Sequence, residues 1–365
     1  MVKRVGIAAL LLGSLLLYAC GSAGAYRNES KNTGGSFSVI IETFQAPNQE
    51  ETELSTASQE FSYETITAEE SKPIYRETFS FPEEFYIELD GLIEKYGLNQ
   101  GCDGTLECGC LPENETYDEE GNVITARKKT LSLYFMDLNS GFEYELNPGA
   151  HYPVASTVKV PFCTFIYRKI DAGEIDPEQV LTYEPRHYFE GTGKIVKGEF
   201  GQQFTVSELL ELTITNSDNV AYEMLKDLIT WQEFSDFLAE NGCNHEQDIR
   251  QSKQKICTQS AGVYCKIMHD YLKSGGCAET FGDDLQTANL RMISSNYPVY
   301  RKYGWAGFSF HDVAFVDAPR PYLLAIMSNL ENIDNSDLPV FRDISMLVEK
   351  YSQDENNVSG EWVMP

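Results

Sequence analysis

The chain has 365 residues, of which 42% are hydrophobic, and it carries 28 basic against 56 acidic side chains, a formal charge of −28. This length and apolar content predict a globular protein of one large domain or two smaller ones. So large an acidic excess repels phosphate backbones, and we therefore exclude nucleic-acid binding.

The first 19 residues predict an export signal. Lys3 and Arg4 precede an apolar run, Val5–Tyr18, which at 14 residues is shorter than the roughly 20 that a membrane-spanning helix needs. Cys20 follows between small residues, as in a bacterial lipidation site. We therefore expect a lipoprotein signal peptide over residues 1–19 and an exported protein, anchored by lipid at Cys20 to the outer face of a bacterial membrane. The alternative is an ordinary signal peptide with an incidental cysteine.

The rest of the chain divides by composition. Residues 20–80 are rich in Ser, Thr, Glu, Asn and Gly without sustained periodicity, which predicts a lipid-anchored disordered linker rather than a small extra domain. We expect the folded domain over residues 81–352 and a polar tail over 353–365. Within the domain, residues 99–128 combine clustered cysteines with an acidic run and predict a surface insertion.

Eight cysteines remain beyond Cys20, and they allow 105 pairings, so the sequence fixes none of them. Cys102, Cys108 and Cys110 lie close together, but no histidine is near and their spacing is not that of a zinc site. We expect neither a metal nor another cofactor. Cys163 is expected to pack in the core as a small apolar group.

In chain order the sequence predicts a helix, two strands, a long helical stretch, three strands and a closing helix. Thr205 and Glu208 form a T-x-x-E capping box inside the helical stretch. Strands at both ends with helices between them predict an α/β (α+β) fold, with an antiparallel sheet built from both termini, flanking helices and a mainly helical insert. The predicted segments are Phe85–Tyr96, a half-buried strand over Leu131–Phe135, Phe142–Leu146, about 155–290, Tyr300–Phe308, His311–Val316, Tyr322–Met327 and Leu347 onward.

Three short motifs occur in order along this pattern. Ser156-Thr157-Val158-Lys159 is followed 61 residues later by Ser217-Asp218-Asn219, and Lys302-Tyr303-Gly304 begins another 85 residues on. Positions i and i+3 of a helix share a face, so Lys159 can lie beside the Ser156 hydroxyl. A serine hydroxyl is a poor nucleophile until a base takes its proton, and a partly buried lysine can lose its charge and act as that base.

The other motif residues have matching chemistry. We expect Ser217 to relay a proton to a leaving nitrogen, Asn219 to bind a substrate amide and Lys302 to attract a substrate carboxylate. The backbone N–H groups of Ser156, near a helix start, and of Trp305, just after the third motif, would stabilise an oxyanion. The alternative is that all of these are ordinary helix, turn and strand residues.

Over about residues 81–352 the chain resembles the class A β-lactamase family and its penicillin-binding relatives. The resemblance implies the sheet-and-helix fold, Ser156 as the acylated nucleophile and Lys159 as its base. It also implies Ser217 as proton shuttle, and Asn219, Lys302, Tyr303, Gly304 and Trp305 as substrate-binding residues. The stretches that carry it are Ala155–Pro161, Gly191–Gly193, Leu212–Asn219, Lys302–Ala306 and His311–Ala314.

Two departures from that family matter. Class A enzymes carry an E-x-x-L-N motif whose glutamate activates the deacylating water. The stretch between Gly242 and Thr258, where it is expected, lacks it, and Glu246 is the only glutamate there. Unless Glu246 replaces that base, deacylation should be slow. Tyr303 stands where the family usually has Thr or Ser, and we expect it to narrow the site or stack on a ligand, or else to face away.

The sequence thus predicts a cell-surface serine hydrolase that acts through a Ser156 acyl-enzyme on a β-lactam or D-Ala-D-Ala-like amide, a small molecule or a peptidoglycan peptide. A true β-lactamase with an unusual deacylation route remains an alternative, as does a catalytically silent cell-wall-binding lipoprotein. Near the site, Tyr188 and Phe189 are expected to be buried core aromatics, with a place on the rim of the site as the alternative. His311 is expected to belong to a hairpin turn.

Overall fold

The computed structural model describes residues 74–102, 107, 110, 114–243, 255–332 and 335–363. The predicted signal peptide, Cys20 and the linker up to residue 73 lie outside these ranges, as do Cys108 and Glu246. Within them, no helix is both long enough and apolar enough to span a bilayer.

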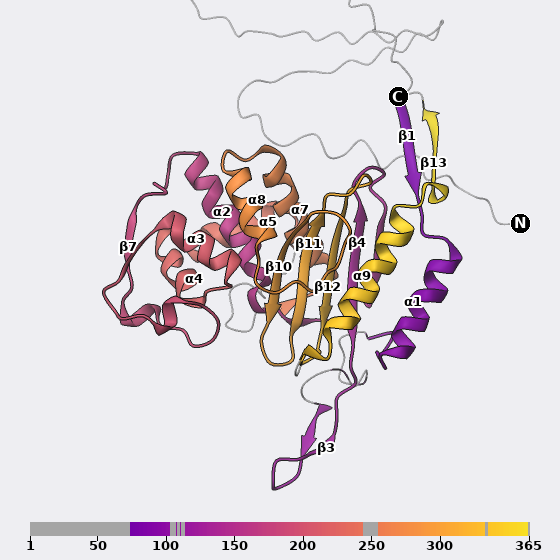
Figure 1. The fold of residues 1–365 in the computed structure, drawn as a ribbon, viewed down its shortest axis with the longest axis horizontal. Coiled ribbons are helices and arrows are strands. Elements are labelled where there is room, and N and C mark those ends of the chain that lie inside the picture. The colour runs from indigo at the N-terminus through magenta and orange to yellow at the C-terminus, as the bar shows by residue number, and fades with distance from the viewer. Residues whose placement is uncertain are drawn as a thin grey trace, which may run out of the picture. The chain divides into compact units, whose positions relative to one another are not determined.

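A five-stranded antiparallel sheet lies at the centre of the described domain (Figure 1). Its order is β10-β11-β12-β4-β5, so an early strand pairs with the last of three late ones. This arrangement confirms the predicted sheet built from both ends of the domain. The strands are β10 (Val299–Trp305), β11 (Phe310–Val316), β12 (Tyr322–Ser328), β4 (Leu131–Asp137) and β5 (Glu143–Leu146).

Helices α1 (Glu83–Lys95) and α9 (Leu338–Ser352) cover one face of this sheet. Phe85 of α1 and Phe341 of α9 are fully buried in the apolar core that they share with the sheet. α9 begins well before the predicted start at Leu347, because its first turn contains a proline and its buried stripe already starts at residue 340.

The other face is covered by the predicted helical insert, in which α7 packs directly on the sheet. β4 is therefore buried on both sides, and the prediction of a half-buried strand is wrong. Leu133 and Phe135 face α1 and α9, whereas Tyr134 faces the helical insert. The insert helices are α2 (Lys159–Asp171), α3 (Val206–Thr215), α4 (Asn219–Leu225), α5 (Trp231–Glu240), α7 (Thr258–Ser274) and α8 (Ala278–Gln286), with the strand pair β7 (Val180–Thr182) and β8 (Gln203–Thr205).

A separate two-stranded sheet joins the two ends of the described chain. β1 (Ile74–Phe79) lies in the predicted linker and β13 (Val358–Val363) in the predicted tail, yet they pair antiparallel over six residues. The folded domain therefore extends past both boundaries predicted from composition. Their pairing joins residues up to 289 positions apart (Ile74 with Val363), which no local pattern reveals.

The predicted insertion over residues 99–128 carries an exposed hairpin formed by β2 (Thr116–Tyr117) and β3 (Val123–Thr125). Its returning end is fixed to the sheet, because the Arg127 guanidinium lies 3.5 Å from the ring centroid of Phe308, between β10 and β11. The insertion thus lies on the surface and also contacts the turn between β10 and β11.

Candidate active site

Ser156 lies in a short 3-10 helix, η3 (Ala155–Val158), that runs directly into α2. Its side chain is half-buried, whereas Lys159, the first residue of α2, is 2% exposed. Ala155 adopts a φ of +49°, a conformation that costs a residue with a Cβ roughly 1–3 kcal/mol. The Thr157 hydroxyl holds this turn by donating a 2.7 Å hydrogen bond to the carbonyl of Val154.

The Lys159 amine makes two short hydrogen bonds. Nζ donates to the backbone carbonyl of Ser217 and to Oδ1 of Asn219, each over 2.8 Å, and it lies 3.5 Å from the Ser217 hydroxyl. Burial lowers the pKa of Lys159 to about 7, although Asp218 acts in the opposite direction. A neutral amine has two N–H groups and one lone pair. The amine also donates a third, longer hydrogen bond to the Ser217 hydroxyl, over 3.5 Å. Only the neutral form, which the lowered pKa makes accessible near pH 7, has a lone pair that can accept a proton from a hydroxyl.

Ser217 lies in the turn between α3 and α4, and Asn219 is the first residue of α4. Ser217 is buried and has a φ of +52°, a second strained residue at this site. Its carbonyl accepts bonds from Lys159 and from the Thr192 hydroxyl, the latter over 2.8 Å. Asn219 Nδ2 donates to the carbonyl of Glu190 over 3.3 Å, so the turn is fixed to the loop before α3.

Asp218, between these two residues, is fully buried and accepts four backbone hydrogen bonds. Oδ1 accepts from the N–H groups of Val220 and Ala221 and so caps α4, while Oδ2 accepts from those of Lys194 and Ile195. Gly193 has a φ of +136°, and a Cβ there would lie 2.4 Å from the Asp218 carboxyl carbon. Only glycine permits the loop to approach this carboxylate so closely.

The third motif lies on β10, at the edge of the sheet next to η3. Lys302 is fully buried, and its Nζ donates to the carbonyl of Tyr303 over 3.0 Å and lies 4.0 Å from the centroid of the Tyr303 ring. Burial and the nearby Lys159 amine lower the pKa of Lys302 well below its usual value. A hydrogen bond with the Ser217 side chain limits the rise that burial causes in the pKa of Tyr303. The Tyr303 ring thus lies beside the Lys302 amine, and it also belongs to the apolar core that the sheet shares with α1 and α9.

The backbone after Lys302 borders Ser156. A Cβ on Gly304 would lie 3.1 Å from the backbone nitrogen of Ser156, so only glycine fits without a shift. Ala306 and Ser309 form a hydrogen-bonded pair at the end of the β10–β11 ladder, because the N–H of each donates to the carbonyl of the other, over 2.9 and 3.1 Å. In an antiparallel ladder the next pair, which includes Trp305, leaves its N–H groups pointing away from the partner strand. The Trp305 N–H thus points to the free edge of β10, on the side of Ser156.

Three expectations about neighbouring residues need correction. Tyr188 and Phe189 are 54% and 53% exposed rather than buried, because they lie on the surface loop that leads to Gly191. His311 lies inside β11 rather than in a turn. It is fully buried and its Nε2 is 2.8 Å from the Pro153 carbonyl, just before η3. Cys163 is fully buried, as predicted.

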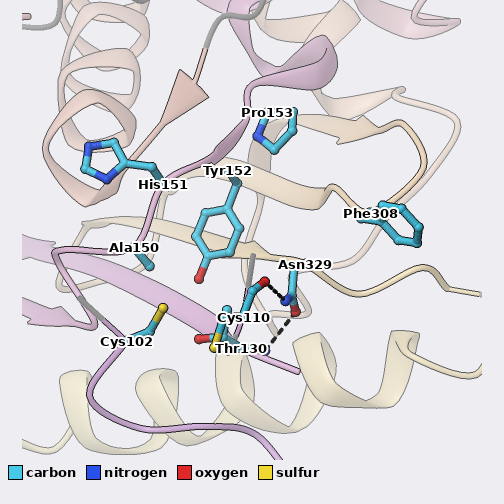
Figure 2. Close-up of a pocket in the computed structure, with 9 residues that line it drawn as sticks. All are labelled: Cys102, Cys110, Thr130, Ala150, His151, Tyr152, Pro153, Phe308 and Asn329. Atoms are coloured by element: carbon cyan, nitrogen blue, oxygen red, sulfur yellow. Dashed lines mark hydrogen bonds between the residues drawn. The ribbon is translucent and has the colours of Figure 1, made fainter. Parts of the chain in front are cut away.

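A small pocket is lined in part by residues 150–153, the segment that leads to Ser156 (Figure 2). Tyr152 and Pro153 line it from β6, which pairs with β9 (Lys255–Ile256). None of the predicted catalytic residues lines this pocket. Among the described residues no three His, Cys, Asp or Glu side chains gather to hold a metal. The lining residues are Cys102, Cys110, Thr130, Ala150, His151, Tyr152, Pro153, Phe308 and Asn329.

The structure thus brings the three motifs together, since Lys159 contacts Ser217 and Asn219, and Tyr303 contacts both Lys302 and Ser217. Thr192 was expected only as part of the Gly191–Gly193 stretch that resembles the family, with no role of its own, and Asp218 only as the middle residue of the second motif. Asp218 could have been identified as a helix cap, because an aspartate directly before an apolar helical stripe is a typical N-cap.

Comparisons with known proteins give one family. The model of the Beta-lactamase enzyme family matches residues 117–352. Beta-lactamase VEB-1 of Pseudomonas aeruginosa is 27% identical over 110 residues, 30% of this chain and 37% of that protein. CARB-4 of the same organism is 24% identical over 135 residues, 34% of this chain and 44% of that protein. The chain therefore matches less than half the length of these curated relatives.

Solved structures share the fold at low identity. A mutant of PBP-A, solved as an acyl-enzyme complex with penicillin G, superposes with a TM-score of 0.54 and 21% identity over 61% of this chain and 89% of that one. A β-lactamase from Sphaerobacter thermophilus gives 0.55 and 18% over 62% and 92%. An ancestral class A β-lactamase gives 0.56 and 16% over 73% and 99%.

Proposed function

Because the chain belongs to the Beta-lactamase enzyme family, we propose that it is a serine hydrolase that forms an acyl-enzyme through Ser156. Its substrates would be amides or esters of the β-lactam or D-Ala-D-Ala-like kind. The family and the α/β fold confirm the resemblance expected from the sequence. The matched region covers almost two-thirds of the chain and contains all three motifs.

One observation carries the proposal: the buried Lys159 amine donates 2.8 Å hydrogen bonds to the Ser217 carbonyl and to Asn219 of the second motif, and burial lowers its pKa to about 7. A general base that acts near neutral pH requires a pKa lowered in this way. This amine lies one helical turn after a half-exposed serine.

The chemistry follows from these positions. Lys159 Nζ accepts the Ser156 hydroxyl proton as Oγ bonds to the substrate carbonyl carbon, and the N–H groups of Ser156 and Trp305 stabilise the oxyanion. The carbon–nitrogen or carbon–oxygen bond then breaks, and the proton passes through the Ser217 hydroxyl to the leaving atom. Water later cleaves the Ser156 ester, releasing the acid and restoring the hydroxyl.

We propose that this last step is slow. The E-x-x-L-N motif is absent between Gly242 and Thr258. Without a positioned base the deacylating water loses the roughly 10²–10⁴-fold acceleration that general-base catalysis provides. A long-lived acyl-enzyme is the expected result.

We also propose export and lipid attachment at Cys20, on the basis of the basic start, the short apolar run and the small residues around that cysteine. The test is expression in a bacterium fed a radiolabelled fatty acid. Label on the full chain and none on Cys20→Ala is expected, and equal labelling of both would contradict the anchor.

The function is tested by intact mass spectrometry of the full chain over time after addition of penicillin G. We expect an adduct on the parent protein that persists for hours and is missing from Ser156→Ala. Ser274→Ala, which removes an exposed serine at the end of α7, should behave like the parent. A transient adduct with accumulating product would instead identify an efficient β-lactamase. No adduct with penicillin G or with a D-Ala-D-Ala-like depsipeptide would contradict the proposal.

A further inference from the structure

The ring of Tyr303 covers the amine of Lys302. The two groups are neighbours on β10, yet the Lys302 side chain turns back so that Nζ lies 4.0 Å from the Tyr303 ring centroid. Nζ also donates to the Tyr303 carbonyl over 3.0 Å. One tyrosine thus contacts this amine through both its ring and its backbone.

This contact seals the amine from solvent. Lys302 is 0% exposed, and Tyr303 itself is only 6% exposed. The Ser217 side chain also acts on the phenol, since it opposes the rise that burial causes in the pKa of Tyr303. The ring and the backbone carbonyl of Tyr303 therefore occupy contact positions around the Lys302 amine that a substrate anion would need.

A substrate carboxylate that entered the site beside Tyr303 would lose its hydrating water without gaining a contact with the Lys302 ammonium. Burying a charged group without a partner costs several kcal/mol, far more than burying an uncharged ester of similar shape. The chain's net charge of −28 also disfavours the approach of anions over longer distances.

We propose that Tyr303 is a specificity-determining residue that closes the Lys302 site to substrate carboxylates, so that the enzyme prefers acyl donors that are uncharged next to the scissile bond. The inference rests on the proposed acyl-enzyme at Ser156 and specifies its substrate class. Within that class, donors that carry a carboxylate beside the leaving nitrogen are the poor substrates.

Penicillin G and its methyl ester make a matched pair of probes, because they differ only in that carboxylate. The measurement is the second-order rate constant for addition of the whole β-lactam to the full chain, followed by intact mass spectrometry. We expect the methyl ester to react at least tenfold faster than penicillin G with the parent protein. An equal rate, or a faster reaction of the free acid, would overturn the inference without any variant.

Variants at position 303 then test whether the Tyr303 ring causes the difference between the two rate constants. Tyr303→Thr should accelerate penicillin G and reduce the ratio of the two rate constants below about three. Tyr303→Phe keeps the ring and should keep the ratio. Tyr300→Thr removes a tyrosine of the same strand whose ring stacks on Phe315, and it should leave the ratio unchanged.

The outcomes separate the two proposals. If Tyr303→Thr folds, as judged by circular dichroism, and retains the parent ratio, the assignment to Tyr303 is wrong while the acyl-enzyme stands. If neither probe adds to the parent protein in a Ser156-dependent way, the proposed function fails and this inference fails with it.

Discussion

Thr192 and Lys159 donate hydrogen bonds to the same atom, the backbone carbonyl oxygen of Ser217, each over 2.8 Å. The lysine bond comes from the proposed base, and the threonine bond comes from the glycine-flanked loop before α3. Together they hold Ser217 in a conformation with positive φ. The loop is thus coupled to the geometry of the base.

Thr192→Val should therefore slow acylation about fivefold, because loss of one hydrogen bond costs about 1 kcal/mol and loosens Ser217. The acylation rate constant with penicillin G or its methyl ester checks this. Thr215→Val is the matched control, since the Thr215 hydroxyl bonds only locally, to Glu211 of its own helix and to Asn216. Equal rates for Thr192→Val and the control would show that the loop does not position Ser217.

The pH dependence of acylation should report Lys159. Its pKa of about 7 lies below the usual value, so the neutral, proton-accepting form predominates above pH 7 and falls tenfold per pH unit below it. The acylation rate should rise with pH up to about 7 and then level off. A rate independent of pH between 5 and 8 would contradict the assignment of Lys159 as base.

Lys159→Arg should abolish acylation, because a guanidinium stays protonated at every accessible pH. Lys169→Arg is the matched control on the same helix, where the amine makes exposed ion pairs with Glu174 and Glu233. Acylation of Lys159→Arg at the parent rate would identify another base.

Gly193→Ala should weaken both stability and acylation. Its Cβ would lie 2.4 Å from the carboxyl carbon of Asp218, which accepts four backbone N–H groups, so the loop or the cap of α4 has to move. We expect a loss of about 3 kcal/mol in the free energy of unfolding, combining backbone strain with lost hydrogen bonds. Denaturant unfolding measures it.

Gly201→Ala is the control for Gly193→Ala, because it introduces the backbone strain of a positive φ without a clash with neighbouring atoms. Gly201 also has a positive φ, +94°, but no atom lies within 4 Å of its added Cβ. It should lose only about 1–2 kcal/mol, the cost of the backbone conformation. Equal losses in the two variants would mean that the contact of Gly193 with Asp218 contributes nothing.

His311 should make the fold sensitive to mild acid. Burial lowers its pKa to about 4, whereas an unfolded histidine titrates near 6.5, so protons bind the unfolded chain more tightly. The contribution of neutral His311 to the free energy of unfolding is fully present above pH 6.5. It is lost as the pH falls toward 4, and the loss amounts to about 3 kcal/mol. Free energies of unfolding between pH 7.5 and 4.5 should fall less steeply for His311→Gln. His269→Gln is the control, and a slope for His311→Gln equal to that of the parent protein would refute the assignment.

The sequence predicted those features that depend on neighbours a few residues apart. Ser156 and Lys159 lie one helical turn apart, and the Thr205–Glu208 box forms as predicted, with bonds of 3.1 and 2.7 Å. The roles of Ser156, Ser217 and Lys302 stay predictions, although the fold places their motifs side by side.

The rest depends on contacts between distant segments. The pattern of β4 looked half-buried because nothing local shows that α1 and α9 cover one face of the sheet and the helical insert covers the other. The departure at Tyr303 could be seen in the sequence, but its position over Lys302 follows from the packing of β10 beside η3. The strand pair β1–β13 was not predicted, because it also depends on contacts between distant segments.

The β1–β13 pair also makes the domain suitable for circular permutation. Ile74 and Val363 face each other in the ladder, where opposite Cα atoms of antiparallel strands lie about 4.5–5.5 Å apart. A peptide of a few residues from 363 to 74 would close the domain into a ring, and new termini could be opened at the exposed Gly121 between β2 and β3. Such a circular permutant keeps every strand neighbour of the sheet, so the architecture does not require that synthesis begin at β1.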